Sequence, residues 1–364
     1  MENQERLLTA IKLGTPDMVP YCDYFNSASI VNICRTLYGD DQIASGQIDV
    51  DFGTDQFEVS ALLIRMTRDL DIDALFAYGM PGLREVPGDD KLIQDAFGNT
   101  YRKTALEPIP VEGAVKNQHD LKKISTIRPQ DEDFRLLEYF KQNAPERALI
   151  YNVADAFKLS WRFLGAMEKL MPLYINDPGF IRKLARVATD FLKVEIEMAI
   201  EKGADVIVQD GDWAETKKPL LSPKMFREFI KPFCSEMTDT AHRFGVPIIK
   251  HSDGNVAALL DDIVEAGYDG FHPVEPQAMD MVEVKERLKG KICVMGNIDC
   301  MYLLPFGKPE EVVEAVKETL KIAAPGGGYI CSSSNSVHPG VRAENAIAMI
   351  RAVRKYGKYP IQVG

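Results

Sequence analysis

The sequence predicts an α/β fold, a (β/α)8 barrel of the TIM type. Short apolar runs alternate with amphipathic helical stretches, which is typical of a parallel sheet covered by helices. No glycine-rich phosphate loop follows an early strand, as it normally does in the alternative, an open doubly wound sheet. About eight strands are expected, beginning near residues 19, 74, 149, 206, 247, 270, 292 and 329.

Helices are expected between the strands and at both ends of the chain. The first contains Leu7 and Ile11 and ends near Gly14. Another begins after Ser222, with Pro223 in its first turn, where the fixed φ angle of proline suits a helix. It runs towards residue 244. The remaining helices are expected over residues 178–202, 255–266, 279–288, 309–323 and 343–356.

One segment, residues 85–106, departs from the alternation. Residues 92–95 and 101–104 flank the turn 97–100, Phe-Gly-Asn-Thr, a pattern that predicts a β-hairpin. We expect this hairpin to be an insertion near the barrel. Residues 1–364 are therefore predicted to form one barrel domain with an N-terminal helical segment.

Composition and charge exclude several classes of protein. The chain is 46% hydrophobic and 27% charged, as soluble globular enzymes are. A formal charge of -11 argues against a nucleic-acid partner, because phosphate binding needs a basic face. No apolar run is long enough to span a membrane, and the polar N-terminus does not resemble a signal peptide, so the cytoplasm is the expected compartment. The sequence leaves open whether the protein forms a homodimer.

Polar side chains follow at least five of the expected strands. Because the carboxyl ends of barrel strands converge on one mouth, we expect these side chains to share one site. The candidates are Asp210, Asp212, His251, Asp253, Glu275, Asn297, Asp299 and Asn335.

His251 is the strongest single candidate for a catalytic residue, since it ends a strand and is one of five histidines. Asp253 follows it closely, and its alternative role is that of a helix N-cap. His272 is expected to be a core histidine.

Asp210 and Asp212 flank Gly211, and two carboxylates this close raise one pKa unless a cation or donor holds them. A metal, a substrate cation and a general acid are all compatible with the pair, as is a loop anchored by Lys217 or Lys218.

Glu275 lies in a proline-framed apolar turn, where a carboxylate is costly to bury without a partner. His251, Asp253 and Glu275 are thus candidate ligands of a three-ligand catalytic metal drawn from neighbouring strand ends, although no HExxH or Cys-rich zinc pattern occurs. Asn297 either orients substrate or fixes its loop.

Aromatic residues provide candidates for substrate binding. Trp161, with Phe157 and Phe163, either lines an apolar pocket or packs in the core. Tyr24 follows the first expected strand. We expect Tyr24 and Trp161, with Asp212 and Asn297, to contact substrate.

Five stretches of the chain resemble the uroporphyrinogen decarboxylase superfamily. They are PLLSPKMFREFIKP at 219–232, HSDGN at 251–255, EPQAMD at 275–280, GNID at 296–299 and the block from GGGYI at 326 to Pro339-Gly340. The resemblance implies a barrel with its active site at the carboxyl ends of the strands.

The superfamily contains decarboxylases and corrinoid-dependent methyltransferases. The decarboxylases carry an Arg-Gln-Ala-Gly-Arg segment after the first strand, but this chain reads Tyr-Cys-Asp-Tyr-Phe-Asn-Ser at 21–27. A polycarboxylate substrate would lack its counter-charges there. Methyltransferases that act on thiols hold zinc with His-x-Cys and a late Cys. Here His251 matches the histidine, Asp253 stands at the first cysteine and Asn335 falls near the second.

The resemblance, with these departures, implies methyl transfer from a small donor, such as a methoxylated aromatic compound, to the cobalt of a corrinoid. The sequence shows no Asp-x-His-x-x-Gly corrinoid signature, so the corrinoid is expected on a partner protein, and zinc is a possible cofactor. Asp210, His251, Glu275 and Asn335 are the expected catalytic residues. Two alternatives stay open: a decarboxylase of a small acid, using Arg35, Arg65 or Arg84 as a clamp, and a non-catalytic tetrapyrrole- or corrinoid-binding module.

Overall fold

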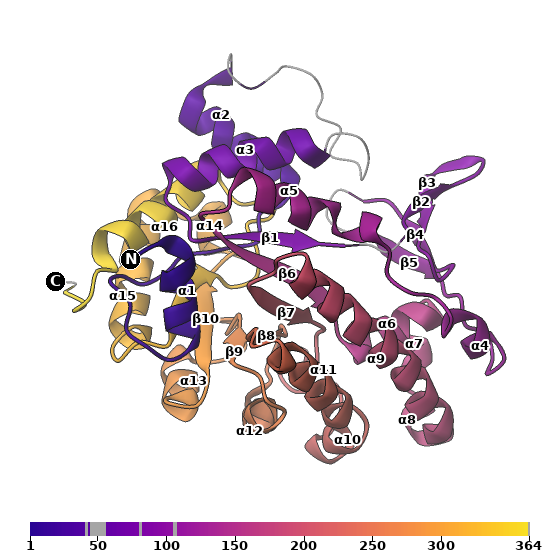
Figure 1. Ribbon diagram of the computed structural model, residues 1–364. Coiled ribbons are helices and arrows are strands. Elements are labelled where there is room, and N and C mark those ends of the chain that lie inside the picture. The colour runs from indigo at the N-terminus through magenta and orange to yellow at the C-terminus, as the bar shows by residue number, and fades with distance from the viewer. Residues whose placement is uncertain (41–42, 44–55, 80–81, 105–107, 363–364) are drawn as a thin grey trace.

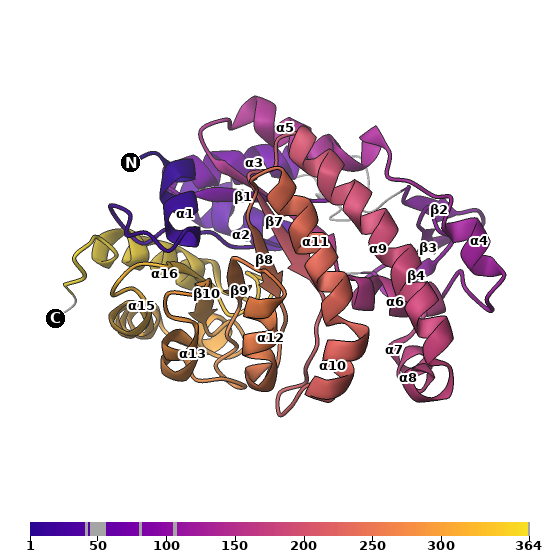
Figure 2. The same cartoon turned by 60° about the horizontal axis from the view of Figure 1, so that its bottom comes forward.

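The computed structural model describes residues 1–40, 43, 56–79, 82–104 and 108–362. At its centre lies a seven-stranded parallel sheet with the order β1-β6-β7-β8-β9-β10-β11, curled so that helices cover its outer side (Figures 1 and 2). A second, four-stranded antiparallel sheet has the order β2-β3-β4-β5. The α/β class predicted from the sequence is confirmed.

The strands are β1 (Ala74–Tyr78), β2 (Arg84–Val86), β3 (Asp89–Gln94), β4 (Thr100–Arg102), β5 (Ile109–Glu112), β6 (Ala148–Ala154), β7 (Val206–Asp210), β8 (Ile248–His251), β9 (Gly270–His272), β10 (Cys293–Ile298) and β11 (Tyr329–Ser333). The helices of the N-terminal half are α1 (Asn3–Ile11), α2 (Ser27–Tyr38), α3 (Gln56–Asp69), α4 (Asp120–Ile124), α5 (Arg135–Asn143), α6 (Ala156–Leu164), α7 (Met167–Leu170), α8 (Leu173–Asn176) and α9 (Pro178–Glu201). Those of the C-terminal half are α10 (Pro223–Phe229), α11 (Lys231–Arg243), α12 (Leu260–Glu265), α13 (Met281–Leu288), α14 (Leu303–Phe306), α15 (Pro309–Ala323) and α16 (Ala343–Tyr356).

The first expected strand, near residue 19, is present only as a bridging segment. Cys331 N in β11 donates a hydrogen bond to Pro20 O (2.9 Å), and Asp73 N, just before β1, donates to Tyr21 O (2.9 Å). Only Tyr21 pairs with β11 as an isolated bridge. The segment therefore connects the two edges of the curled sheet without forming a full strand in the described part of the chain. Seven of the eight expected strands are found.

The predicted hairpin belongs to a larger structure. β3 and β4 pair antiparallel, and β2 and β5 extend the pair on either side. This sheet spans residues 84–112 and lies on the side of the molecule opposite the N- and C-termini (Figures 1 and 2).

Two expected helices differ from those observed. The helix after Ser222 is divided, because Pro232 in the first turn of α11 has no N–H to donate to the preceding turn. The stretch 255–266 begins with a 3-10 turn, and α12 starts only at Leu260. The expected helices at 309–323 and 343–356 coincide with α15 and α16.

Apolar side chains fill the inside of the curled sheet, and α1 closes one end of it. Alternate residues of the strands, such as Val206 and Val208 in β7, join Leu7 and Ile11 of α1 in one buried cluster. The larger core lies between the sheet and the outer helices. Since α1 packs against β1, β6 and β11 at the amino ends of the strands, the carboxyl ends are left for a site.

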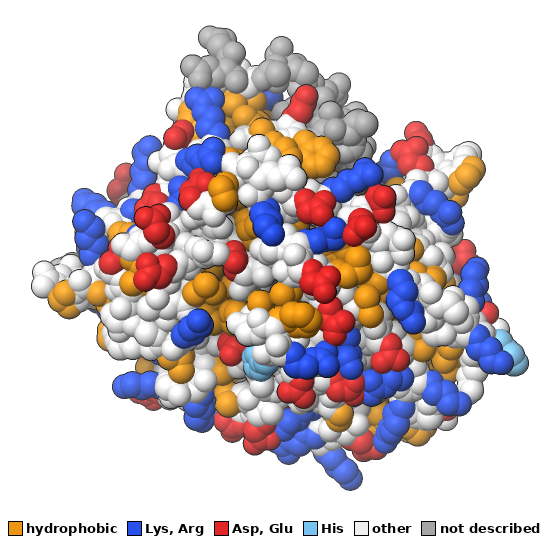
Figure 3. All heavy atoms as spheres, viewed as in Figure 1, with side chains coloured by type: hydrophobic (Ala, Val, Ile, Leu, Met, Phe, Trp, Pro, Cys, Tyr) orange, Lys and Arg blue, Asp and Glu red, His pale blue; other side chains and the backbone are white. Residues whose placement is uncertain are grey.

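Charged side chains of both signs are interspersed over the face of the molecule seen in Figure 3. Among the described residues, no helix combines the length and the apolar character that a membrane span requires.

Candidate functional site

Strand register places three of the candidate residues side by side. Asp210, the last residue of β7, pairs with His251, the last residue of β8, and His251 pairs with His272, the last residue of β9. Ala154 of β6 continues the same row. The carboxyl ends of four neighbouring strands are thus level, as the parallel arrangement predicts.

His251 and His272 are joined directly. Their Nδ1 atoms lie 2.7 Å apart, so one ring donates a hydrogen bond to the other. His272 is buried, and burial followed by the nearby His251 ring lowers the pKa of His272 well below its ordinary value. His272 is therefore neutral. The sequence predicted that His272 is a core histidine, and His272 is indeed buried. Its contact with His251 was not predicted.

The other nitrogen of His251 is directed at carboxylates. Nε2 lies 3.8 Å from Oδ1 of Asp212 and 3.7 Å from Oδ1 of Asp253. Asp253 N donates a hydrogen bond to Asp212 Oδ1 (3.0 Å), which fixes the two loops against each other. Asn335 Nδ2 donates to Asp253 Oδ2. Three expected site residues thus meet around Asp253: Asp212 after β7, His251 at the end of β8 and Asn335 after β11.

Asp253 lies among several carboxylates, so the local negative charge is in excess. Burial, together with the charges of Asp212 and Glu275, raises the pKa of Asp253 to about 6 against the attraction of His251. Its Oδ1 atom is buried and accepts no hydrogen bond from the described residues. The helix N-cap role considered for Asp253 is not observed, since no described backbone amide donates to its side chain. A proton or a cation would relieve the charge.

Asp210 has its own counter-ion, which is not one that the sequence suggested. Lys158 Nζ lies 2.6 Å from Asp210 Oδ2. Burial alone would raise the pKa of Asp210, but the positive charges of Lys158 and His251 outweigh it and hold that pKa well below its usual range. Lys217 and Lys218, the expected anchors, are exposed, and Lys218 lies 4.0 Å from Glu215.

Lys158 is positioned by the residue that begins its helix. Asp155 is the N-cap of α6 and accepts a hydrogen bond from the backbone N of Lys158. Asp155 is fully buried and also accepts from Trp213 Nε1 (2.6 Å) and Lys250 Nζ (2.9 Å). Gly211 lies against it so closely that a Cβ there would be 2.2 Å from Asp155 Cγ. The acidic pair at 210 and 212 is therefore separated by a glycine for steric reasons.

Sequence reasoning missed Lys158, Lys250 and the role of Asp155. The only signal was that Asp155 follows β6 and precedes α6, which is the usual place of an N-cap. Lys250 is fully buried, with its Nζ 3.8 Å from the centre of the Trp213 ring.

Glu275 and Asn297 contact the loops around the cluster. Glu275 Oε2 accepts a hydrogen bond from Gly254 N (2.9 Å), in the loop that follows His251. Asn297 is nearly buried, and its Nδ2 donates to Val274 O (3.0 Å). Asp299 accepts from the backbone N of Met301 and caps its own loop.

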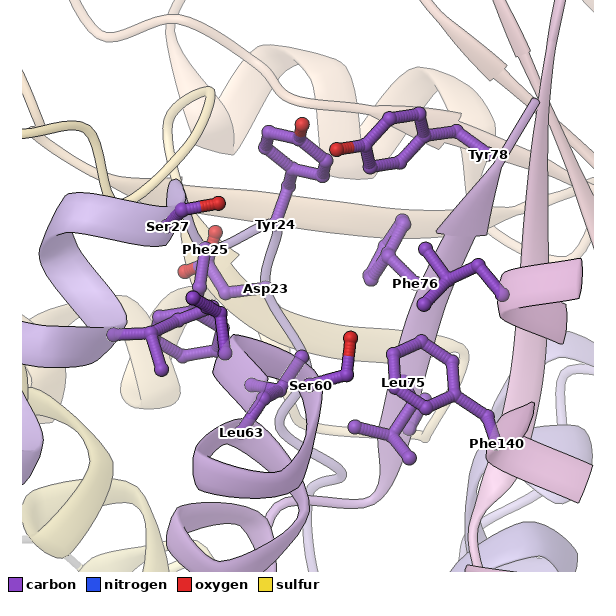
Figure 4. Close-up of a pocket in the computed structure, with 14 residues that line it drawn as sticks. Asp23, Tyr24, Phe25, Ser27, Ser60, Leu63, Leu75, Phe76, Tyr78 and Phe140 are labelled. Atoms are coloured by element: carbon purple, nitrogen blue, oxygen red, sulfur yellow. The ribbon is translucent and has the colours of Figure 1, made fainter. Parts of the chain in front are cut away.

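The two aromatic candidates lie apart from this cluster. Tyr24 packs against Phe76 and Tyr78 and lines a separate pocket (Figure 4). Trp161 is half-buried on α6, packed against the core, with the Arg162 guanidinium 5.8 Å from its ring centre. No contact described for Trp161 joins it to His251.

One set of side chains has the spacing of a metal site. One ligand atom each from Asp210, Asp212 and His251 lie within 4.8 Å of one another. This set shares His251 with the expected ligands but has Asp210, the last residue of β7, and Asp212 in place of Asp253 and Glu275. Two carboxylates and an imidazole suit a divalent cation such as zinc.

The family of the chain is shown by comparison. A model of the family described as Uroporphyrinogen decarboxylase (URO-D) matches residues 92–356, most of the chain. The chain belongs to this family. The resemblance inferred from the motifs is thereby confirmed.

Curated relatives carry two kinds of name. The uroporphyrinogen decarboxylase of Anaeromyxobacter dehalogenans is 28% identical over 189 residues, which are 52% of this chain and 52% of that protein. The methylcobamide:CoM methyltransferase MtaA of Methanosarcina barkeri is 24% identical over 191 residues, 52% of this chain and 53% of that protein. The chain thus spans about half the length of the curated relatives it matches.

A solved structure confirms the fold over nearly the whole chain. A methyltransferase from Methanosarcina mazei superposes with a TM-score of 0.73 at 18% identity, covering 98% of this chain and 99% of that one.

Proposed function

We propose that this protein is a methyltransferase that moves a methyl group from a small donor to the cobalt of a separate corrinoid protein. The observation that carries the proposal is the convergence of His251, Asp253 and Asn335. These positions correspond by resemblance to the zinc ligands of thiol-methylating relatives, and here they are in contact but offer no thiolate. A thiol acceptor would lack the thiolate-bound zinc that activates it in those relatives. The opposite half-reaction, from donor to corrinoid, needs no thiolate.

The cysteines of the chain support this choice. All six are buried. Cys300, which contacts Ser334 next to Asn335, is buried in a way that raises the pKa of its thiol. Buried thiols with raised pKa values do not present a thiolate at neutral pH. Among the described residues, the group of side chains with the spacing of a metal site contains no cysteine.

The residues fit a divalent cation. Asp210, Asp212 and His251 would hold it, with Nε2 of His251 as the nitrogen ligand, because Nδ1 is engaged by His272. The buried Oδ1 of Asp253, which accepts no hydrogen bond from the described residues, is an additional acceptor beside the cluster. A cation bound there would act as a Lewis acid on the oxygen from which the methyl group departs.

The reaction also needs a proton donor and a fixed arrangement of the loops, and side chains of the cluster supply both. A methyl ether has a poor leaving group, so its oxygen needs a proton when the carbon–oxygen bond breaks. Lys158 is a donor whose ammonium is held at the site by Asp210. Glu275 and Asn297 fix the loops that carry Asp253 and Val274 and thereby keep the cluster in place.

The decarboxylase alternative is favoured by the name of the matching family and by the name of the relative from Anaeromyxobacter dehalogenans. It requires cations that grip a carboxylate, and the arginines expected to do so are engaged elsewhere. Arg65 stacks on the Tyr38 ring at 3.6 Å, and Arg84 donates to Gln94 (3.0 Å). Arg35 lies 3.8 Å from Asp40.

The proposal is tested by visible spectroscopy. The purified protein, a reduced corrinoid protein and a methoxylated arene should together give the spectrum of methylcobalamin, and the His251→Ala variant should not. Absence of the spectrum with every methyl donor tried, in a protein loaded with zinc, contradicts the proposal.

A further inference from the structure

Arg162 is a half-buried arginine without an acidic partner. Four arginines of the described chain are not exposed, namely Arg6, Arg147, Arg162 and Arg354. The other three each form an ion pair with Asp71 or Asp73, just before β1. Arg162 forms none with any described carboxylate, and its Nε atom is enclosed without a hydrogen-bond partner. This isolation is unusual, because buried charged groups are normally paired.

Arg162 lies on the helix that begins beside the His251 cluster. α6 follows β6, and Asp155 N at its start donates a hydrogen bond to Asp210 O (2.8 Å). Lys158, the counter-ion of Asp210, is four residues before Arg162, and residues at this spacing lie on the same face of a helix. Burial raises the pKa of Asp210, and Arg162 is one of the positive groups whose charges outweigh that effect. Arg162 is therefore on the side of α6 that is turned towards the site.

The carboxyl groups on which the charge of Arg162 acts do not pair with it. Asp210 already has Lys158 as its counter-ion, at 2.6 Å. Glu195 of α9 is a second such group, but burial, followed by the charge of Asp133, raises the pKa of Glu195 to about 8, so this side chain is protonated at pH 7. The guanidinium group of Arg162 thus keeps its charge and its hydrogen-bond donors for a further partner.

A purely structural role does not explain the position of Arg162. A cation in the last turn of a helix interacts favourably with the helix dipole, but an exposed arginine does so equally well, and its Nε atom need not be enclosed. The Trp161 ring replaces no carboxylate, since the guanidinium carbon lies 5.8 Å from its centre, near the outer limit of a cation–π contact. An enclosed cation is costly without an anion beside it, so an anion from outside the chain explains the position better.

We propose that Arg162 binds the carboxylate of an anionic methyl donor, such as a methoxybenzoate. This inference rests on the proposed function, for which it defines the class of substrate. A guanidinium fork forms two parallel hydrogen bonds with a carboxylate, so it fixes the orientation of the substrate as well as its position. With the carboxylate at Arg162, the ring and its methoxy group extend from α6 towards Asp210 and His251. An uncharged donor would leave Arg162 unpaired and would bind more weakly.

Binding is tested by calorimetry on the full chain at pH 7, without a corrinoid protein. Two probes of nearly the same shape are compared, 4-methoxybenzoate, which is an anion, and 4-methoxybenzamide, which is uncharged. We expect the benzoate to bind roughly tenfold more tightly or better, because its hydrogen bonds to a guanidinium group are charge-assisted. Equal affinities, tighter binding of the amide, or no binding of the benzoate would overturn the proposal.

Variants locate the carboxylate. Arg162→Met removes the charge and should abolish the preference for the benzoate while leaving the affinity for the amide unchanged, whereas a structural role would change both affinities alike. Arg351→Met is the matched control, since Arg351 is an exposed arginine of α16, and it should keep the wild-type preference.

Arg162→Lys tests the fork itself. Lysine keeps the charge but cannot form the two parallel hydrogen bonds, so only part of the preference should remain. If Arg162→Met, folded as judged by its circular dichroism, prefers the benzoate as the wild type does, the assignment is wrong. If Arg162→Met does not fold, an undiminished preference in Arg162→Lys contradicts the assignment instead.

The two proposals fail separately. A preference for 4-methoxybenzoate that depends on Arg162, without methyl transfer from any donor to a corrinoid protein, supports the carboxylate site and contradicts the methyltransferase. Methyl transfer that is equally fast from the benzoate and the amide, and unchanged in Arg162→Met, does the reverse.

Discussion

The Nδ1 atoms of His251 and His272 lie 2.7 Å apart, and this contact determines what His251 can offer at its other nitrogen. When Nδ1 of His251 carries the shared proton, its Nε2 presents a lone pair to the side of Asp212 and Asp253, as a metal ligand must. His272 is thus placed to orient the ring and to set its tautomer. Such partners of metal-binding histidines are important for affinity.

Replacement of His272 by Phe should therefore lower the affinity for zinc by about 10- to 100-fold. The ring volume is kept, while the hydrogen bond to His251 is lost. Affinity is measured by competition with a chelating dye. His242→Gln is the control, because His242 is partly exposed and bonds to Asp269 on the outer side. Unchanged affinity in the His272 variant would contradict the role given to the pair.

Lys158 should control both the charge of Asp210 and the supply of a proton. Lys158→Met removes the nearest positive charge, so the pKa of Asp210 should rise and the acid limb of the pH–rate profile should move to higher pH. The rate at the optimum should fall by about 10²- to 10⁴-fold, as for loss of a general acid.

Lys158→Arg separates the two roles. Arginine restores the charge beside Asp210 but does not release a proton in the neutral range. The acid limb should therefore return to its wild-type position while the rate stays low. A rate equal to that of the wild type would show that Lys158 acts through its charge alone.

Lys250 and Asp155 form a fully buried ion pair at 2.9 Å that positions the start of α6. Lys250→Met leaves Asp155 without its buried counter-ion, which should lower the free energy of unfolding by about 3–5 kcal/mol. Urea denaturation measures the loss. Lys321→Met is the control, since the exposed pair of Lys321 and Glu318 should be worth about 1 kcal/mol or less. Equal losses in the two variants would contradict the prediction.

Glu195 should make the protein less stable as the pH rises. This buried side chain of α9 contacts Tyr151, and burial, followed by the charge of Asp133, raises the pKa of Glu195 to about 8 from an ordinary 4.5. Because the folded state binds the proton more tightly, the stability this group provides is present below pH 4.5 and is lost as the pH rises through 8.

Glu195→Gln removes that loss. The variant should gain stability over the wild type between pH 5 and 8, reaching a few kcal/mol, with a constant difference above pH 9. Thermal unfolding at several pH values measures the effect. Glu201→Gln, at the exposed end of the same helix, should show no such trend. A pH-independent difference for Glu195→Gln would refute the assignment.

The sequence predicted those parts of the site that depend on strand ends. Asp210, His251 and Asn335 each follow an apolar run, and the parallel sheet brings such positions together by its own geometry. The ligand set stays a prediction: Asp253 and Glu275 were expected beside His251, whereas the spacing also suits Asp210 and Asp212, and the choice depends on loop conformations. Those loops are fixed by hydrogen bonds to distant backbone amides, such as the one from Gly254 to Glu275.

Residues whose role depends on tertiary packing could not be predicted from the ends of strands. Lys158 and Lys250 are lysines in a helix and a strand, and most such lysines lie in solvent. Both lysines depend on Asp155, which precedes α6 and accepts a hydrogen bond from Lys250, a residue more than ninety positions away in sequence. The four-stranded sheet was recognised only in part, because its outer strands β2 and β5 are three and four residues long and carry little pattern.

The central claim is that the methyl group itself travels from donor to cobalt. It is tested most directly with a donor deuterated in its methoxy group, incubated with the zinc-loaded protein and a reduced corrinoid protein, followed by mass spectrometry of the corrinoid. The account predicts a trideuteromethyl group on the cobalt, and none with His251→Ala. A corrinoid that gains no label, with release of carbon dioxide from a carboxylic acid substrate instead, would contradict it.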